Sequence, residues 1–147
     1  MKPINGSAQL RKGRVSHKGY VYHVTLTLEN RNPVFLDFFK AQYLKRCLVN
    51  SDEQGFTETY CFCIMPDHLH WLFQLNLESL PRVISRVKSE YSRSTKTKVW
   101  QDGYHDHAVR SDESLINIAR YIVSNPLRAN LVSKVRNYPH WDSIWLK

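Results

Sequence analysis

Hydrophobic and polar residues repeat along the chain with two different periods, which predict strands and helices. The strand-like segments are rich in β-branched and aromatic side chains and comprise residues 20–30, 56–65 and 68–75. The helical segments place apolar side chains on one helix face and comprise residues 34–51, 80–91 and 113–125. Ser79 and Pro81 open the second of these helices. Ser111 or Asp112 can cap the third, which ends near Pro126.

The order of these elements predicts the fold class. Strand, helix, strand, strand and helix are followed by a further helix, and a fourth strand is expected within residues 99–110. This order indicates an α+β fold, close to the ferredoxin-like (RRM-like) arrangement, with helices on one face of an antiparallel sheet. A length of 147 residues fits a single domain, residues 1–147. Residues 1–18 read as a basic N-terminal arm, and the tail from Tyr138 shows no clear element.

The distribution of charge adds a candidate partner. Lys and Arg number 21 against 13 Asp and Glu, a formal net charge of +8. No acidic residue precedes Glu29, and Glu90 is the one acidic residue between Arg82 and Lys98. Basic segments interleaved with aromatic residues favour a nucleic acid over a generic solvated surface. The candidate contacts in these segments are Arg11, Lys12, Arg14, Lys18, Arg93, Lys96 and Lys98.

Cysteine spacing and hydropathy exclude other classes of protein. The cysteines are Cys47, Cys61 and Cys63, which form no C-x-x-C pair and are expected to be small core residues. No apolar run approaches the length of a membrane span, and the N-terminus lacks the apolar core of a signal peptide. We therefore expect a soluble, cytoplasmic protein with no membrane partner.

The segment MPDHLHWLFQL (residues 65–75) contains two histidines on one face of a strand. Because side chains alternate in a strand, the apolar face toward the helices comprises Leu69, Trp71, Phe73 and Leu75. His68 and His70 then share the other, uncovered face, about 7 Å apart along the strand. Two imidazoles at this spacing can bind one metal ion. The alternative is a pair of solvated polar residues, and the H-x-H spacing alone does not decide between them.

The segment RYIVSNPLRANLV adds a second set of candidates. Tyr121 and Asn125 are four residues apart on the last helix and hence on one face. Tyr121 offers a phenolic nucleophile and Asn125 an oxygen ligand. Taken alone, the pair also fits a core-facing tyrosine and an asparagine that ends the helix before Pro126.

Together these segments resemble a known family. MPDHLHWLF resembles the histidine–hydrophobic–histidine motif of the HUH single-strand endonucleases. WQDGYHDHAVRS followed by ARYIVSNPLRANLV is similar to the signature of the single-tyrosine transposases, especially the REP-associated tyrosine transposases (RAYT). The resemblance extends over residues 15–140, and the order and spacing of three separate motifs agree.

The resemblance implies a role for each matched residue. His68 and His70 match the metal-binding pair, with Leu69 as the hydrophobic spacer. Tyr121 matches the nucleophile, and Asn125 matches the third metal ligand, a position occupied by Gln in many relatives. The implied cofactor is a divalent ion, Mg or Mn, because imidazole and amide ligands leave coordination positions open for phosphate and water.

The resemblance also implies a substrate and a reaction. The substrate is single-stranded DNA beside a hairpin, such as a REP-like palindrome, in the bacterial cytoplasm and nucleoid. Tyr121 would attack phosphorus and leave a 5′-phosphotyrosine and a 3′-hydroxyl, and attack by another 3′-hydroxyl would rejoin strands. His107 and Arg110 match a further part of the signature, where they could contact phosphate or hold the loop.

Alternatives remain open on the same fold. One is a domesticated, non-catalytic hairpin-binding protein, and another is a metal-dependent phosphodiesterase that uses water in place of Tyr121. Tyr91 is an alternative nucleophile, but it fits the core face with Val87 and lacks a following Asn. A monomer is preferred to a dimer, because the tail offers no obvious helix to exchange.

Overall fold

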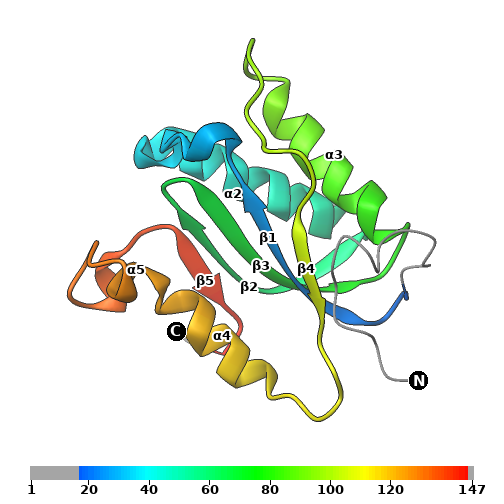
Figure 1. Cartoon of the computed structure of the whole chain (residues 1–147). Coiled ribbons are helices and arrows are strands. Elements are labelled where there is room, and N and C mark those ends of the chain that lie inside the picture. The colour runs from blue at the N-terminus through cyan, green and yellow to red at the C-terminus, as the bar shows by residue number, and fades with distance from the viewer. Residues whose placement is uncertain (1–16, 146–147) are drawn as a thin grey trace.

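The computed structural model describes residues 17–145, which form an antiparallel sheet with helices on both faces (Figure 1). The strands are β1 (Val21–Thr27), β2 (Thr57–Met65), β3 (His68–Leu75), β4 (His105–Ala108) and β5 (Trp141–Ser143), in the order β4-β1-β3-β2-β5. The helices are α2 (Phe38–Glu53), α3 (Leu80–Ser92), α4 (Leu115–Val123) and α5 (Asn125–Arg128). The predicted α+β class with an antiparallel, ferredoxin-like sheet is confirmed, including the strand expected within residues 99–110.

One face of the sheet packs against α2 and α3. The side chains predicted to share this face are all fully buried: Leu69, Trp71, Phe73 and Leu75. They join Leu44 of α2 and Val87 of α3 in one hydrophobic core. Figure 1 shows both helices on this side of the sheet. Strand alternation therefore assigned the packing face of β3 correctly.

The opposite face also carries a helix, which corrects the expectation that helices cover one face only. A second core lies between the sheet and α4, formed by Cys61, Cys63, Met65, Leu72, Val109, Ala119, Ile122 and Val123. Every residue of β2 from Cys61 to Met65 is buried. Such a continuous apolar run is typical of a strand that is covered on both faces. The cysteines are free and buried, as predicted.

The C-terminal tail supplies a strand that the sequence did not predict. In β5, Ser143 lies opposite Cys61 and Trp141 lies opposite Cys63 of β2. The strand is only three residues long, too short to show a period in the sequence. No helix within residues 17–145 is long and apolar enough to cross a membrane.

The cap of α4 also differs from the expectation. Ser114, not Ser111 or Asp112, accepts a hydrogen bond from the backbone N–H of Asn117 at 3.2 Å. The reason lies in the preceding turn, where the backbone N–H of Glu113 donates to the carbonyl of Arg110. This turn delays the start of the helix beyond both predicted caps.

Replacing Ser114 by alanine is expected to lower the free energy of unfolding by about 1 kcal/mol, because the helix loses its N-terminal acceptor. Ser111→Ala is the matched control and should leave stability unchanged, because Ser111 is exposed and lies inside the turn, where its side chain caps no helix. Urea denaturation measures both. Equal effects of the two substitutions would contradict the assignment of the cap.

Candidate active site

Polar side chains of three adjacent strands line the sheet face on the α4 side. On β1, Thr25 lies opposite His70 and Thr27 lies opposite His68 of β3. On its other edge, His23 of β1 lies opposite His107 of β4. Residues opposite one another in an antiparallel pair project from the same face. The sheet therefore gathers five histidines from β1, β3 and β4 on one surface: His23, His68, His70, His105 and His107.

The predicted histidine pair is adjacent in the structure. The ring centroids of His68 and His70 are 4.9 Å apart, with the rings nearly perpendicular. Leu69 between them is fully buried in the core on the opposite face. The side-chain directions deduced from strand alternation are thus confirmed.

Each of these histidines has a polar partner at its Nδ1 atom. His68 Nδ1 lies 2.6 Å from a carboxylate oxygen of Asp67, and Asp67 in turn accepts from Arg31 Nε at 3.0 Å. His70 Nδ1 lies 3.1 Å from His23 Nε2 and 3.3 Å from Thr25 Oγ1. Partners at Nδ1 orient an imidazole so that its Nε2 atom can bind a metal.

Burial keeps the central histidines neutral. It lowers the pKa of His70 to about 3, with added repulsion from His23, His68 and Arg128. Burial also lowers the pKa of His23 to about 4, with His107 as the second cause. A neutral imidazole is the form that ligates a metal.

The donor set for a metal comprises the two histidines and, by prediction, Asn125. Within residues 17–145, no group of three or more His, Cys, Asp or Glu side chains is arranged to hold a metal ion. Asn125 begins α5, and its Nδ2 donates to the carbonyl of Ile122 at 3.0 Å. Its Oδ1, the atom suited to a hard divalent ion, is not used in that bond. Within residues 17–145, no hydrogen bond joins Asn125 to the histidines, so its role as third ligand stays a prediction.

Tyr121 shares a cavity with the histidine surface. Its side chain is 56% exposed on α4. A cavity of about 370 Å³ is lined by His23, Glu113, Ser114, Asn117, Ile118 and Tyr121. Because His23 contacts His70, one side-chain contact connects this cavity to the candidate metal-binding pair. The candidate nucleophile therefore shares a cavity with His23, one side-chain contact away from His70.

Tyr91 is ruled out as an accessible nucleophile. It is 2% exposed in the main core, and burial raises its pKa to about 12. Its ring lies edge-on to Phe35 and Trp100. Trp100 is buried too and donates from Nε1 to the carbonyl of Lys88. These aromatic residues hold α3 and the following loop in place.

His107 and Arg110 form a cluster with Glu113. His107 Nε2 lies 2.9 and 3.0 Å from the two carboxylate oxygens, and the backbone N–H of Arg110 donates to the same carboxylate at 2.8 Å. These contacts lower the pKa of Glu113 against the raising effect of its partial burial. The cluster ties β4 to the turn before α4, so its loop-holding role is observed and phosphate contact stays a prediction.

The other candidate DNA contacts fall into two groups. Arg11, Lys12 and Arg14 lie outside the described residues. The second group lies within the described residues and is exposed: Lys18, Arg93, Lys96 and Lys98. Lys98 forms ion pairs with Glu29 at 3.1 Å and Asp102 at 3.0 Å, so its charge is partly compensated.

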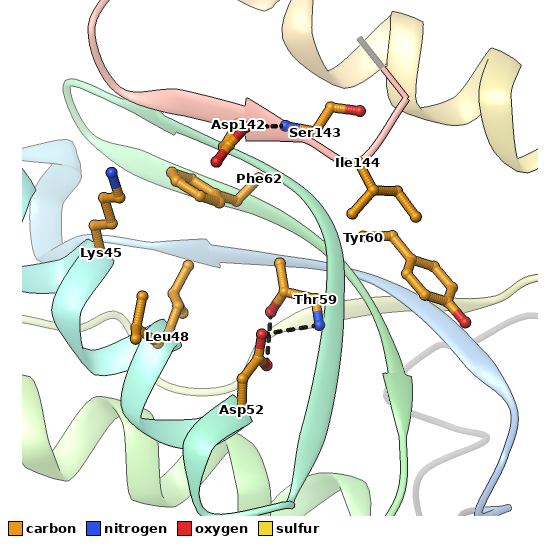
Figure 2. A pocket seen from close by; sticks show the side chains of 10 residues that line it. Lys45, Leu48, Asp52, Thr59, Tyr60, Phe62, Asp142, Ser143 and Ile144 are labelled. Atoms are coloured by element: carbon orange, nitrogen blue, oxygen red, sulfur yellow. Dashed lines mark hydrogen bonds between the residues drawn. The ribbon is translucent and has the colours of Figure 1, made fainter. Parts of the chain in front are cut away.

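Another cavity, shown in Figure 2, lies between α2, β2 and β5. Its volume is about 210 Å³, and no predicted site residue lines it. Asp52 accepts there from the hydroxyl of Thr59 at 2.9 Å and from its backbone N–H at 3.1 Å. These bonds fasten the end of α2 to β2, which makes the role of Asp52 structural.

Sequence reasoning missed several residues at the candidate site. They are His23, Thr25, Asp67, Glu113 and Arg128. The alternation in β1 carries a signal for the first two, because His23 and Thr25 face away from buried Tyr22 and Val24. Their approach to His70 depends on the pairing of β1 with β3, which the sequence does not give.

Comparisons with known proteins agree with this arrangement. A relative from Haemophilus influenzae, named provisionally as a REP-associated tyrosine transposase, is 28% identical, over 84% of this chain and 79% of the relative. A REP-associated tyrosine transposase of Escherichia coli is 22% identical, over 83% of this chain and 75% of its own. The resemblance to these transposases is thus confirmed.

A solved structure shares the fold. It is a REP-associated tyrosine transposase bound to a REP hairpin, with a TM-score of 0.77 and 21% identity, covering 87% of this chain and 79% of that one. Residues 16–125 match the family described as "Transposase IS200 like". Because this match includes most of the chain, with both histidines, Tyr121 and Asn125, the chain belongs to the IS200-like transposase family.

Proposed function

We propose that this chain cleaves and rejoins single-stranded DNA beside REP-like hairpins, with Tyr121 as the nucleophile. The observation that carries the proposal is the cavity shared by Tyr121 and His23, next to His70. The names of the relatives add the hairpin as the partner, since one of them is bound to a REP hairpin. The chain acts on its substrate as a monomer, which sedimentation would test.

The reaction is a transesterification. The Tyr121 oxygen forms a bond to phosphorus, and the bond from phosphorus to the 3′-oxygen of the preceding nucleotide breaks. The phenolic proton passes to water, and the leaving 3′-oxygen takes up a proton. The products are a 5′-phosphotyrosine and a free 3′-hydroxyl, which keep the bond energy needed for rejoining.

The chain's own residues orient this reaction. His68, His70 and Asn125 would hold Mg²⁺ or Mn²⁺, which when bound neutralises phosphate charge and aligns the scissile bond. Asp67 and His23 hold the two histidine rings in place through Nδ1. The His107–Glu113 contact fixes the turn that leads into α4, and thereby the position of Tyr121.

The test is incubation of a hairpin oligonucleotide, labelled at either end, with the chain and Mn²⁺. A 3′-end label should migrate with the protein in denaturing gels, and a 5′-end label should appear in a shorter strand that ends in a 3′-hydroxyl. A shorter 5′-phosphorylated product without an adduct would identify water as the nucleophile. Hairpin binding with no cleavage would favour a non-catalytic protein.

The basic segment at the end of α3 gives a separate prediction. Replacing both Arg93 and Lys96 by alanine should weaken hairpin binding. The slope of log affinity against log salt concentration should become less steep by about 0.9 for each contact to a stem phosphate that is lost. Arg46→Ala, an exposed arginine of α2 outside the basic segment, is the control. Fluorescence anisotropy across salt concentrations measures the slope, and an unchanged slope would remove this segment from the DNA interface.

A further inference from the structure

Arg128 of α5 folds back over the candidate nucleophile. Its Cζ atom lies 4.0 Å from the centroid of the Tyr121 ring. Its Nη2 donates to the carbonyl of Tyr121 at 2.9 Å, and its Nη1 donates to Ser124 Oγ. The ring and the two acceptors thus hold the guanidinium against Tyr121, although Arg128 is exposed.

The same guanidinium lies within electrostatic reach of the histidine pair. The positive charge of Arg128 is one cause of the lowered pKa of His70. It also acts on the thiol of Cys63, which lies opposite His70 on β2. Arg128 is thus a cation that lies against the Tyr121 ring and whose charge reaches His70.

Capping of α4 does not explain this arrangement. Ser124 Oγ already donates to the carbonyl of Tyr121 at 3.0 Å, and Asn125 Nδ2 donates to the carbonyl of Ile122. The last turn of α4 therefore has side-chain donors without Arg128. The bond that Arg128 donates to the Tyr121 carbonyl is a second one, to an oxygen that already accepts from Ser124.

We propose that Arg128 positions Tyr121 and binds the non-bridging oxygens of the phosphate that Tyr121 attacks. The inference rests on the proposed function. The guanidinium has more N–H donors than its two contacts use, and their planar arrangement matches phosphate oxygens. Charge on these oxygens grows as the tyrosine bond forms, so a fixed cation stabilises the transition state more than bound DNA.

The experiment compares the rate of adduct formation on a saturating hairpin oligonucleotide for the wild type, Arg128→Gln and Arg128→Lys. Arg128→Gln should lower this rate about 100-fold or more while hairpin affinity stays within about threefold. Arg128→Lys should recover part of the rate, because it restores the charge but not the planar donor set. The split between a lost rate and a kept affinity distinguishes transition-state binding from general DNA binding.

Two controls separate Arg128 from its surroundings. Ser124→Ala removes the hydroxyl that accepts from Arg128 Nη1 and donates to the Tyr121 carbonyl. The guanidinium remains in this variant, so the rate should fall less than tenfold. Arg120→Gln removes an exposed cation of α4, the helix that carries Tyr121, and should leave the rate unchanged. If Arg128→Gln reacts at the wild-type rate, or if Ser124→Ala loses as much rate as Arg128→Gln, the role of Arg128 is overturned and the proposed function still stands. A wild type that forms no Tyr121 adduct would overturn the proposed function and this inference together.

Discussion

Tyr121→Phe is expected to reduce the covalent protein–DNA adduct to an undetectable level while the fold and hairpin affinity are unchanged. Phenylalanine keeps the aromatic ring under Arg128 and removes only the nucleophilic oxygen. Tyr121 is 56% exposed, and its hydroxyl forms no hydrogen bond within residues 17–145. Its loss should therefore cost little stability. Denaturing gels measure the adduct, and thermal unfolding and anisotropy measure the other two properties.

Tyr43→Phe is the matched control. Tyr43 is also an exposed tyrosine on a helix, α2, but its hydroxyl donates to the carbonyl of Glu90 on the other side of the sheet. The adduct should form at the wild-type rate in this variant. An adduct that persists in Tyr121→Phe would show that another nucleophile carries the reaction.

Strand alternation is the part of the fold that the sequence states most directly. In β3, Leu69 and Trp71 are fully buried, whereas His68 and His70 lie on the other face, as the pattern predicts. The pattern works because each strand faces a continuous apolar core on one side. Helix spacing likewise located α3, where Ser79 caps the first turn.

Features that depend on distant partners could not be predicted in this way. The strand β5 forms because residues 141–143 pair with the outer edge of β2. The burial of Cys61 and Cys63 by α4 shows in the apolar run of β2, but the run does not say which helix covers it. The start of α4 after its cap, Ser114, depends on the turn that the backbone N–H of Glu113 closes.

The candidate site likewise contains some residues that local sequence predicts and others that depend on distant partners. His68 and His70 are two residues apart, so their side chains project together whatever the rest of the fold does. His23 approaches His70 only because β1 and β3 pair in one particular register. Arg128 reaches Tyr121 only because α5 turns back after Ser124. Local geometry predicts the pair of histidines, and contacts between elements distant in the sequence supply the residues that orient the site.

Replacing His68 and His70 together by alanine is expected to remove Mn²⁺ binding by the free chain and, with it, DNA cleavage. Their ring centroids are 4.9 Å apart, so the two imidazoles can bind one ion together. Electron paramagnetic resonance of Mn²⁺ measures binding without a DNA substrate. Chelation by EDTA should abolish adduct formation by the wild type.

Graded variants sharpen this prediction. His23→Ala should weaken Mn²⁺ affinity about 10- to 100-fold, because His70 loses the nearer of the two partners of its Nδ1 while His68 and His70 remain. His17→Ala is the control and should bind Mn²⁺ like the wild type, since its ring contacts Tyr20 and not the histidine pair. Mn²⁺ binding that survives in the double variant would place the metal elsewhere, and adduct formation that survives EDTA would make the reaction independent of metal. Either result would leave His68 and His70 as structural residues of the sheet face.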